Sequence, residues 1–322
     1  MSAIETSVTT QAWARLAQQF PKPRAIVVVS AHWISHGVKV TSSHRPETIH
    51  DFGGFPRALY EKQYPAPGEP ALAQRVKDLL SPFQAQLDLH RGLDHGVWCV
   101  LTCMYPEADI PVVQVSLDAK REPKEHFSMA QKLSTLRDDN ILLLASGNIV
   151  HNLRAYFLIG KMTAWVRSFD NYIKQAVEKG DDEALVNYQK HPDAAEAAPD
   201  WEHYFPVLYG AAWRLPDEGP AVKELEFIPG LSMTMFGYGT LAWVLAIIML
   251  AIGAMAMELA QDVEDVASWH KTTNVVVNGT RAPSLFLGHG SPMNAIETTL
   301  STQIWEKLAQ QFPKPQANGP FS

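Results

Sequence analysis

The chain has 322 residues, of which 46% are apolar and 19% charged, and its formal net charge is −7 at pH 7. This composition indicates one large globular domain or two small ones and excludes a disordered chain. The negative charge argues against a nucleic-acid partner, because binding to phosphates favours a basic surface.

The sequence contains two cysteines, Cys99 and Cys103, which are too few for a disulfide framework. We therefore expect buried thiols in a reducing compartment, and hence a cytoplasmic protein. The first residues show neither the basic nor the apolar region of a signal peptide.

One segment occurs twice, at residues 1–23 and again at 293–315. Both copies predict the same amphipathic helix ending at a proline, because apolar residues follow the i, i+3, i+4, i+7 pattern. The pattern is Trp13, Leu16, Ala17 and Phe20 in the first copy, and Trp305, Leu308, Ala309 and Phe312 in the second. A single domain of this kind has one groove that can bind this helix, so only one of the two copies can occupy it. We expect the N-terminal copy to fill it, although the opposite outcome stays open.

The next segments alternate between strands and helices. The predicted strands are 25–31, 112–117 and 141–146, the predicted helices are 70–80, 123–137, 164–179 and 203–212, and 182–202 is predicted to be a loop. This alternation favours an α/β fold with a central, largely parallel sheet covered by helices on both faces.

The segment 241–257 is apolar and carries no charge. As a helix it would span about 26 Å, slightly less than a hydrocarbon core of about 30 Å. A membrane span would also separate the strand at 284–288 from the sheet. We therefore expect a packed helix or an association surface, and a possible homo-oligomer through this segment or the repeated helix.

Histidines follow three of the apolar strands. His32 ends the first strand, His151 comes shortly after the strand 141–146, and His289 ends the strand 284–288. Parallel strands place their carboxyl ends at one edge of a sheet, where sites form, and imidazole binds Fe, Zn, Cu and Ni. A single histidine of this kind is more often structural, but three together predict a metal or acid–base site. His95 and His203 are further candidates in loop-like contexts.

The remaining histidines considered are expected to be solvated at the surface. They are His36, His44, His90, His126, His191 and His270.

Several longer motifs resemble the bacterial 4,5-DOPA extradiol dioxygenase-like proteins of the class III extradiol dioxygenase family. They are LFLGHGSPMNAIE, VVVSAHW, TIHDFGGFP, YPAPG, LDHGVW, ASGNIVHNLR and EHYFPVLY. The resemblance covers about 1–237 and 283–317. It implies a fold like the catalytic subunit of these enzymes, with Fe(II), or Zn in the same site, as cofactor. It also implies a small aromatic diol and O₂ as substrates, with a ring-opened semialdehyde as product.

The resemblance also implies roles for individual residues. His32, His203 and His289 match the metal ligands, His151 the active-site base, and His95 a second histidine near the substrate. Glu202 is an alternative to its neighbour His203, because the commoner triad of this chemistry contains a carboxylate.

Aromatic residues near these motifs could stack on the substrate ring, although core packing explains each of them equally well. They are Trp33, Phe52, Phe55, Trp98 and Tyr204.

The order of the motifs differs from that of the family, in which the GHGSP strand opens the chain. Here that strand lies at 284–288, so the order is that of a circular permutation. We expect one catalytic domain from 1–237 and 283–317, a connecting segment with an apolar helix at 238–282, and a tail at 318–322. Two other functions stay open: a metal-binding scaffold on the same fold, and a Zn hydrolase with three histidines and a bound water.

Overall fold

An eight-stranded sheet forms the centre of the protein in the computed structural model, which describes residues 7–239 and 281–289. Its strand order is β3-β2-β4-β1-β5-β10-β9-β6, and the central strands β4, β1, β5 and β10 run parallel. In this order, the strands are β3 (Gln86–Asp88), β2 (Lys39–Thr41), β4 (Val112–Asp118), β1 (Ala25–Ser35), β5 (Ile141–Gly147), β10 (Ser284–Gly288), β9 (Met235–Tyr238) and β6 (Ala221–Lys223). A two-stranded sheet pairs β7 (Phe227–Ile228) with β8 (Leu231–Ser232). The predicted α/β fold is confirmed.

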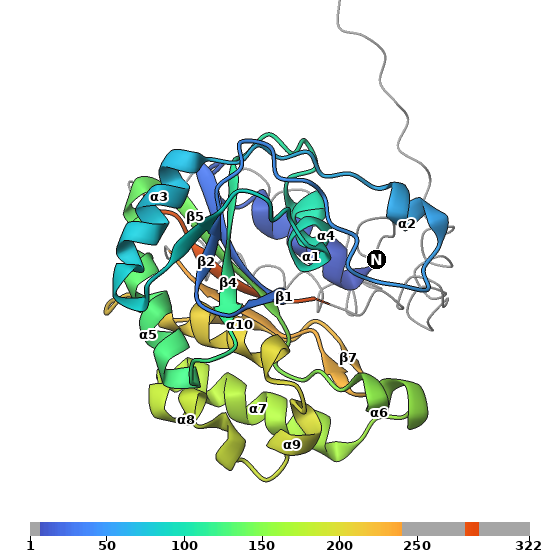
Figure 1. Cartoon of the computed structure of the whole chain (residues 1–322). Coiled ribbons are helices and arrows are strands. Elements are labelled where there is room, and N and C mark those ends of the chain that lie inside the picture. The colour runs from blue at the N-terminus through green and yellow to red at the C-terminus, as the bar shows by residue number, and fades with distance from the viewer. Residues whose placement is uncertain (1–6, 240–280, 290–322) are drawn as a thin grey trace, which may run out of the picture.

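Helices cover both faces of this sheet, because successive side chains of a strand point to opposite faces. Ile26 and Val28 face one apolar cluster, whereas Val27 and Val29 face the other. Figure 1 shows α1 and α4 on one side of the sheet and α5, α7 and α10 on the other. The helices are α1 (Val8–Ala17), α2 (Arg57–Glu61), α3 (Pro70–Leu79), α4 (His95–Met104), α5 (Pro123–Leu133), α6 (Leu153–Leu158), α7 (Ala164–Lys179), α8 (Asp182–Val186), α9 (Ala194–Ala197) and α10 (Trp201–Ala212).

The prediction of a loop at 182–202 is wrong. This stretch contains α8, α9 and a 3-10 turn (Tyr188–Lys190), and it buries Leu185, Ala194 and Ala197. These helices are too short to show a helical repeat of apolar residues, so the sequence pattern misses them. The predicted helix 123–137 also ends earlier, because α5 passes into a 3-10 helix at Ser134–Asp139.

The N-terminal copy of the repeated helix forms α1 and is packed into the core. Trp13 and Leu16 are fully buried in the cluster that includes α4. Ser7 and Thr10 close a capping box at the start of α1. The second copy (293–315) and the apolar segment 241–257 lie outside the described residues. Within 7–239 and 281–289, no helix is long and apolar enough to cross a membrane.

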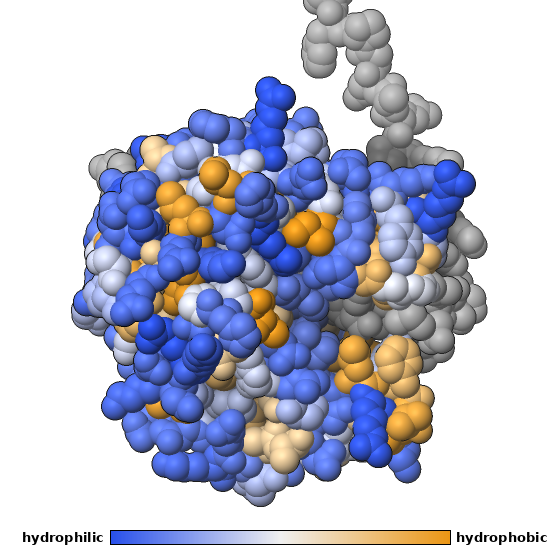
Figure 2. Space-filling view, viewed as in Figure 1, coloured by the Kyte–Doolittle hydropathy of each residue, from blue (hydrophilic) through white to orange (hydrophobic). Residues whose placement is uncertain are grey.

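A cluster of exposed apolar side chains lies over α6 and the turn that follows it. Orange atoms gather there in Figure 2, at the lower right. The exposed residues are Leu153, Phe157, Leu158, Ile159 and Met162. Such a cluster is typical of a surface that contacts another molecule.

The two copies of the repeated helix give a matched pair of variants. If α1 fills the groove, Trp13→Ala should lower the free energy of unfolding by about 3–5 kcal/mol, because it leaves a large cavity. Trp305→Ala, the same change in the second copy, should have a much smaller effect. Denaturant unfolding measures both. Equal losses would show that the two copies share the groove.

Asp170 is a buried carboxyl group on α7. Its side chain is inaccessible to solvent, and Oδ2 accepts a hydrogen bond of 3.0 Å from the Thr234 hydroxyl. Burial disfavours the charged form and raises the pKa of Asp170 to about 6. The folded state therefore binds this proton more tightly than the unfolded chain does.

This raised pKa predicts a pH-dependent stability. Ionised Asp170 destabilises the folded state. This destabilisation is absent below about pH 4, where the carboxyl is protonated in both states, and reaches its full size above about pH 6. Between pH 4 and pH 8, the wild type should lose on the order of 2–3 kcal/mol of unfolding free energy relative to Asp170→Asn. The exposed Asp138→Asn serves as the control. If the difference in unfolding free energy between the wild type and Asp170→Asn stays constant with pH, this account is contradicted.

Candidate metal centre

Five histidines meet at the carboxyl edge of the central strands. His32 lies in β1 where the pairing with β4 shifts between Val29 and Ile34, and such a bulge redirects side chains. His289 directly follows β10, and its backbone N–H donates to Gly147 O at 3.0 Å. The sheet therefore brings together two residues that are far apart in the sequence.

His203 comes from α10, which packs closely against the end of β5. A Cβ atom on Gly147 would lie only 2.4 Å from the His203 carbonyl oxygen, so glycine is required for this approach. His203 O also accepts a hydrogen bond of 2.8 Å from the backbone N–H of Asn148. These contacts hold the first turn of α10 over the strand edge.

His32, His203 and His289 form a group that could hold a metal ion. Their ligand atoms all lie within 4.8 Å of one another, and the two Nε2 atoms of His32 and His289 are 3.0 Å apart. Two nitrogen ligands at right angles, each about 2.1 Å from an ion, would have about this separation. Burial lowers the pKa of all three imidazoles well below the usual value, which favours the neutral form that metal binding needs.

A hydrogen-bond chain sets the protonation of His289. The Ser146 hydroxyl donates its one proton to Gly96 O at 2.6 Å, so it must accept from His289 Nδ1 at 3.1 Å. The lone pair of neutral His289 then lies on Nε2, the atom facing His32. This arrangement suits a metal ligand whose second nitrogen is held by a neighbouring group.

His151 lies against the metal group without belonging to it. Its ring stacks on that of His203, with centroids 3.5 Å apart and an interplanar angle of 2°. Burial, with a smaller contribution from His95, lowers the pKa of His151 to about 4. The imidazole is therefore neutral near pH 7 and can accept a proton.

Glu202, the alternative to His203, is not part of the metal group. Its Oε1 atom lies 3.7 Å from His203 Nδ1, and burial raises the pKa of this carboxyl. His203 Nδ1 itself is buried and has no hydrogen-bond partner within the described part of the chain. An unpaired buried nitrogen of this kind fits a site that takes a further group.

Asp51 belongs to the site, although nothing in its motif TIHDFGGFP distinguishes it as a functional residue from sequence alone. Its Oδ1 atom is 2.9 Å from His95 Nδ1, and His32, Asp51 and His95 form a second group with metal-ligand spacing. Burial alone would raise the pKa of Asp51, but hydrogen bonds from His95 outweigh it and lower the pKa to about 2. The carboxylate is therefore charged next to the histidines.

The predicted aromatic residues divide into two sets. Phe52 lies beside the site, with its ring centroid 5.5 Å from that of His95, and Phe55 packs on Phe52 at 5.2 Å. Trp33 is buried, and the Arg91 guanidinium lies 5.5 Å from its ring centroid.

Two of the aromatic residues instead have structural roles. Trp98 is fully buried, and its indole N–H donates to Ile49 O at 2.8 Å. The Tyr204 ring stacks on Tyr188 at 3.9 Å, and its hydroxyl donates to Leu185 O. Tyr204 therefore packs in the core, which is the alternative considered from the sequence, and its contact with the substrate stays a prediction.

The prediction that His126 is solvated is also wrong. It is fully buried between Asp118 O and the Tyr209 hydroxyl, at 3.1 Å and 3.0 Å from its two ring nitrogens. Its position on the inner face of α5 explains this burial. Cys99 is buried as expected, whereas Cys103 is half-buried, and the two form no disulfide with each other.

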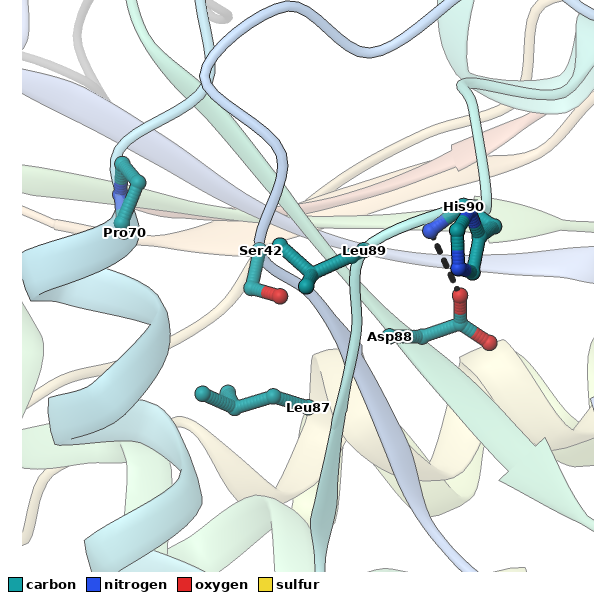
Figure 3. Close-up of a pocket in the computed structure, with 6 residues that line it drawn as sticks. All are labelled: Ser42, Pro70, Leu87, Asp88, Leu89 and His90. Carbon is teal, nitrogen blue, oxygen red and sulfur yellow. Dashed lines mark hydrogen bonds between the residues drawn. The ribbon is translucent and has the colours of Figure 1, made fainter.

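A surface pocket of about 440 Å³ lies beside the edge strands β2 and β3. Figure 3 shows Leu87 and Leu89 near Ser42, and the backbone N–H of His90 donating to Asp88. None of the five clustered histidines lines this pocket. Asp88 and His90 line it, but Asp88 Oδ1 already accepts hydrogen bonds from the backbone N–H groups of His90 and Arg91.

Comparison with known proteins assigns the chain to a family. Residues 3–225 match the catalytic LigB subunit of aromatic ring-opening dioxygenases. The chain belongs to this family. It is a ring-cleaving dioxygenase, which decides against the scaffold and the hydrolase considered from the sequence.

Individual members of the LigB family are also similar to this chain. The 4,5-DOPA dioxygenase extradiol of Escherichia coli K12 is 48% identical over 241 residues, which cover 71% of this chain and 89% of the relative. The protein of the same name from Beta vulgaris is 40% identical over 198 residues, covering 59% and 74% of the two chains. A crystal structure of an uncharacterized E. coli K12 protein is 40% identical with a TM-score of 0.63, covering 72% of this chain and 92% of that one.

The role of Ser146 gives a test of the metal centre in this LigB-family protein. Ser146→Ala removes the acceptor for His289 Nδ1–H, so metal affinity should fall about 10–100-fold. Ser128→Ala is the matched control, because that hydroxyl bonds Lys124 O at the surface. Titration of the apo protein with Zn²⁺ or Co²⁺ measures the affinities. Equal affinities of the two variants would show that Ser146 does not orient a ligand.

Proposed function

We propose that this ring-cleaving dioxygenase uses Fe(II) to open the ring of a catechol beside its two hydroxyls, with a DOPA-like diol as substrate and a semialdehyde as product. The observation that carries the proposal is the convergence of three neutral imidazoles, those of His203 and His289, which are buried, and that of His32, which is half-buried. The names of the E. coli and Beta vulgaris relatives support the choice of diol.

The three imidazoles would hold the metal and leave coordination positions open. When bound, Fe(II) supplies a template for both catechol oxygens and dioxygen and lets electron density pass between them. The chain itself shields part of the site from water, since His203 and His289 are less than 10% exposed, whereas the side chain of His32 is 20% exposed. Phe52 provides an apolar wall beside His95 that suits an aromatic ring.

His151 would act as the general base. Its lowered pKa keeps the ring neutral, and its stacking on His203 places it next to a metal ligand. It can accept a proton from a catechol hydroxyl and return it when the ring opens. The backbone N–H of His151 donates to Ala197 O at 2.8 Å, which holds the residue in place.

The direct test loads the protein with Fe(II) under anaerobic conditions, removes free metal and adds DOPA or unsubstituted catechol with O₂. We expect oxygen uptake and the visible absorbance of a ring-opened semialdehyde. Zn-loaded protein should show neither, because zinc has no redox chemistry. Absence of oxygen uptake by the Fe(II) protein with every catechol tried would refute the proposal.

Replacement of the base should separate catalysis from metal binding. In His151→Gln, kcat/KM should fall about 10²–10⁴-fold while metal content stays near that of the wild type. His191→Gln, which changes a histidine outside the cluster, should retain activity. Metal analysis and steady-state kinetics measure both effects. Loss of metal from His151→Gln would mean that His151 is a ligand instead.

A further inference from the structure

Asp51 makes two hydrogen bonds to His95 through one oxygen. Its Oδ1 atom lies 3.0 Å from the backbone N–H and 2.9 Å from Nδ1 of His95. His95 is the first residue of α4, where a backbone N–H has no acceptor within the helix. Asp51 therefore supplies an acceptor to the start of α4 and holds the side chain of the same residue.

The residue at the N-cap position of α4 cannot take over this task. Asp94 makes no capping hydrogen bond with its side chain. Its two oxygens instead accept from Ser30 at 2.7 Å, Gln114 at 2.5 Å and Arg91 at 3.3 Å. Within the described chain, the orientation of His95 thus depends on Asp51, which comes from a different loop.

This contact determines which nitrogen of His95 carries the proton. A carboxylate only accepts hydrogen bonds, so the Nδ1 atom facing Asp51 must be the donor. A neutral His95 then has its lone pair on Nε2. That atom is buried and has no partner within the described residues. The His95 ring centroid lies 3.9 Å from that of His32 and 6.1 Å from that of His289, so the ring lies beside the metal group.

We propose that Asp51 is a positioning residue that holds His95 with Nδ1 protonated, so that Nε2 serves as a hydrogen-bond acceptor for one hydroxyl of the bound diol. The inference rests on the proposed function for the identity of the ligand. The partner of this lone pair is the diol and not dioxygen, because dioxygen carries no hydrogen and cannot donate to Nε2. The second oxygen of Asp51, 3.9 Å from His32 Nδ1, faces a metal ligand as well.

The first test measures the tautomer directly, without metal or turnover. Imidazole ¹⁵N NMR of the apo protein should show His95 protonated at Nδ1. Asp51→Leu should lose this preference, whereas Asp51→Asn should keep it, because the amide oxygen still accepts. Asp193→Asn, at the His191–Asp193 pair outside the site, is the matched control and should leave the His95 signal unchanged. A wild-type His95 protonated at Nε2, or an unchanged signal in Asp51→Leu, would overturn the proposal.

The second test asks what the Nε2 lone pair binds. Anaerobic titration of the metal-loaded protein should show that catechol binds more tightly than its mono-O-methyl ether, because the ether loses one hydroxyl both as a metal-binding oxygen and as a donor to Nε2. Asp51→Leu should reduce this ratio while it retains its metal. An unchanged ratio would overturn the acceptor role. If His95 shows the expected tautomer but the Fe(II) protein opens no catechol ring, the proposed function is refuted and the role of Asp51 in holding His95 still stands.

Discussion

The metal centre depends on the parallel pairing of β10 with β5. This pairing carries Gly288 opposite Gly147 and places His289 against His32. A slip by one residue would move His289 by about 3.3 Å and turn it to the other face of the sheet. The start of β10 is fixed by buried Arg137, which bonds the backbone N–H and carbonyl of Ala282 and pairs with Glu218. β10 thus lies among the central strands of the sheet, although it comes from the far end of the chain. The circularly permuted order of the motifs remains a prediction.

Burial determines the chemistry of the clustered histidines. Desolvation is the largest contribution to the lowered pKa of His32, His151, His203 and His289, and the neighbouring imidazoles add to it. Protonated rings at these distances would repel one another, so the cluster is stable when it is neutral. Asp51 provides the negative charge beside it. A neutral imidazole is the form that binds a divalent cation, and the carboxylate of Asp51 adds a negative charge beside the three ligands.

Much of the fold and part of the site follow from the sequence. The β-branched run at 25–31 and the apolar runs at 112–117 and 141–146 predicted the central strands, because buried parallel strands are continuously apolar. The positions of the histidines directly after these strands predicted that their side chains lie close together, because the carboxyl ends of parallel strands meet at one edge of the sheet. Asp51, Tyr204 and His126 could not be placed in this way. Their roles depend on which residue of another loop or helix packs against them, and a local pattern carries no such information.

The most direct test of the central claim is the position of the metal itself. Anomalous diffraction at the iron edge from crystals of Fe(II)-loaded protein would locate the ion without assumptions about its ligands. The account predicts a single peak within about 2.0–2.2 Å of nitrogens of His32, His203 and His289. A peak between His32, Asp51 and His95, the second group with suitable spacing, would contradict it.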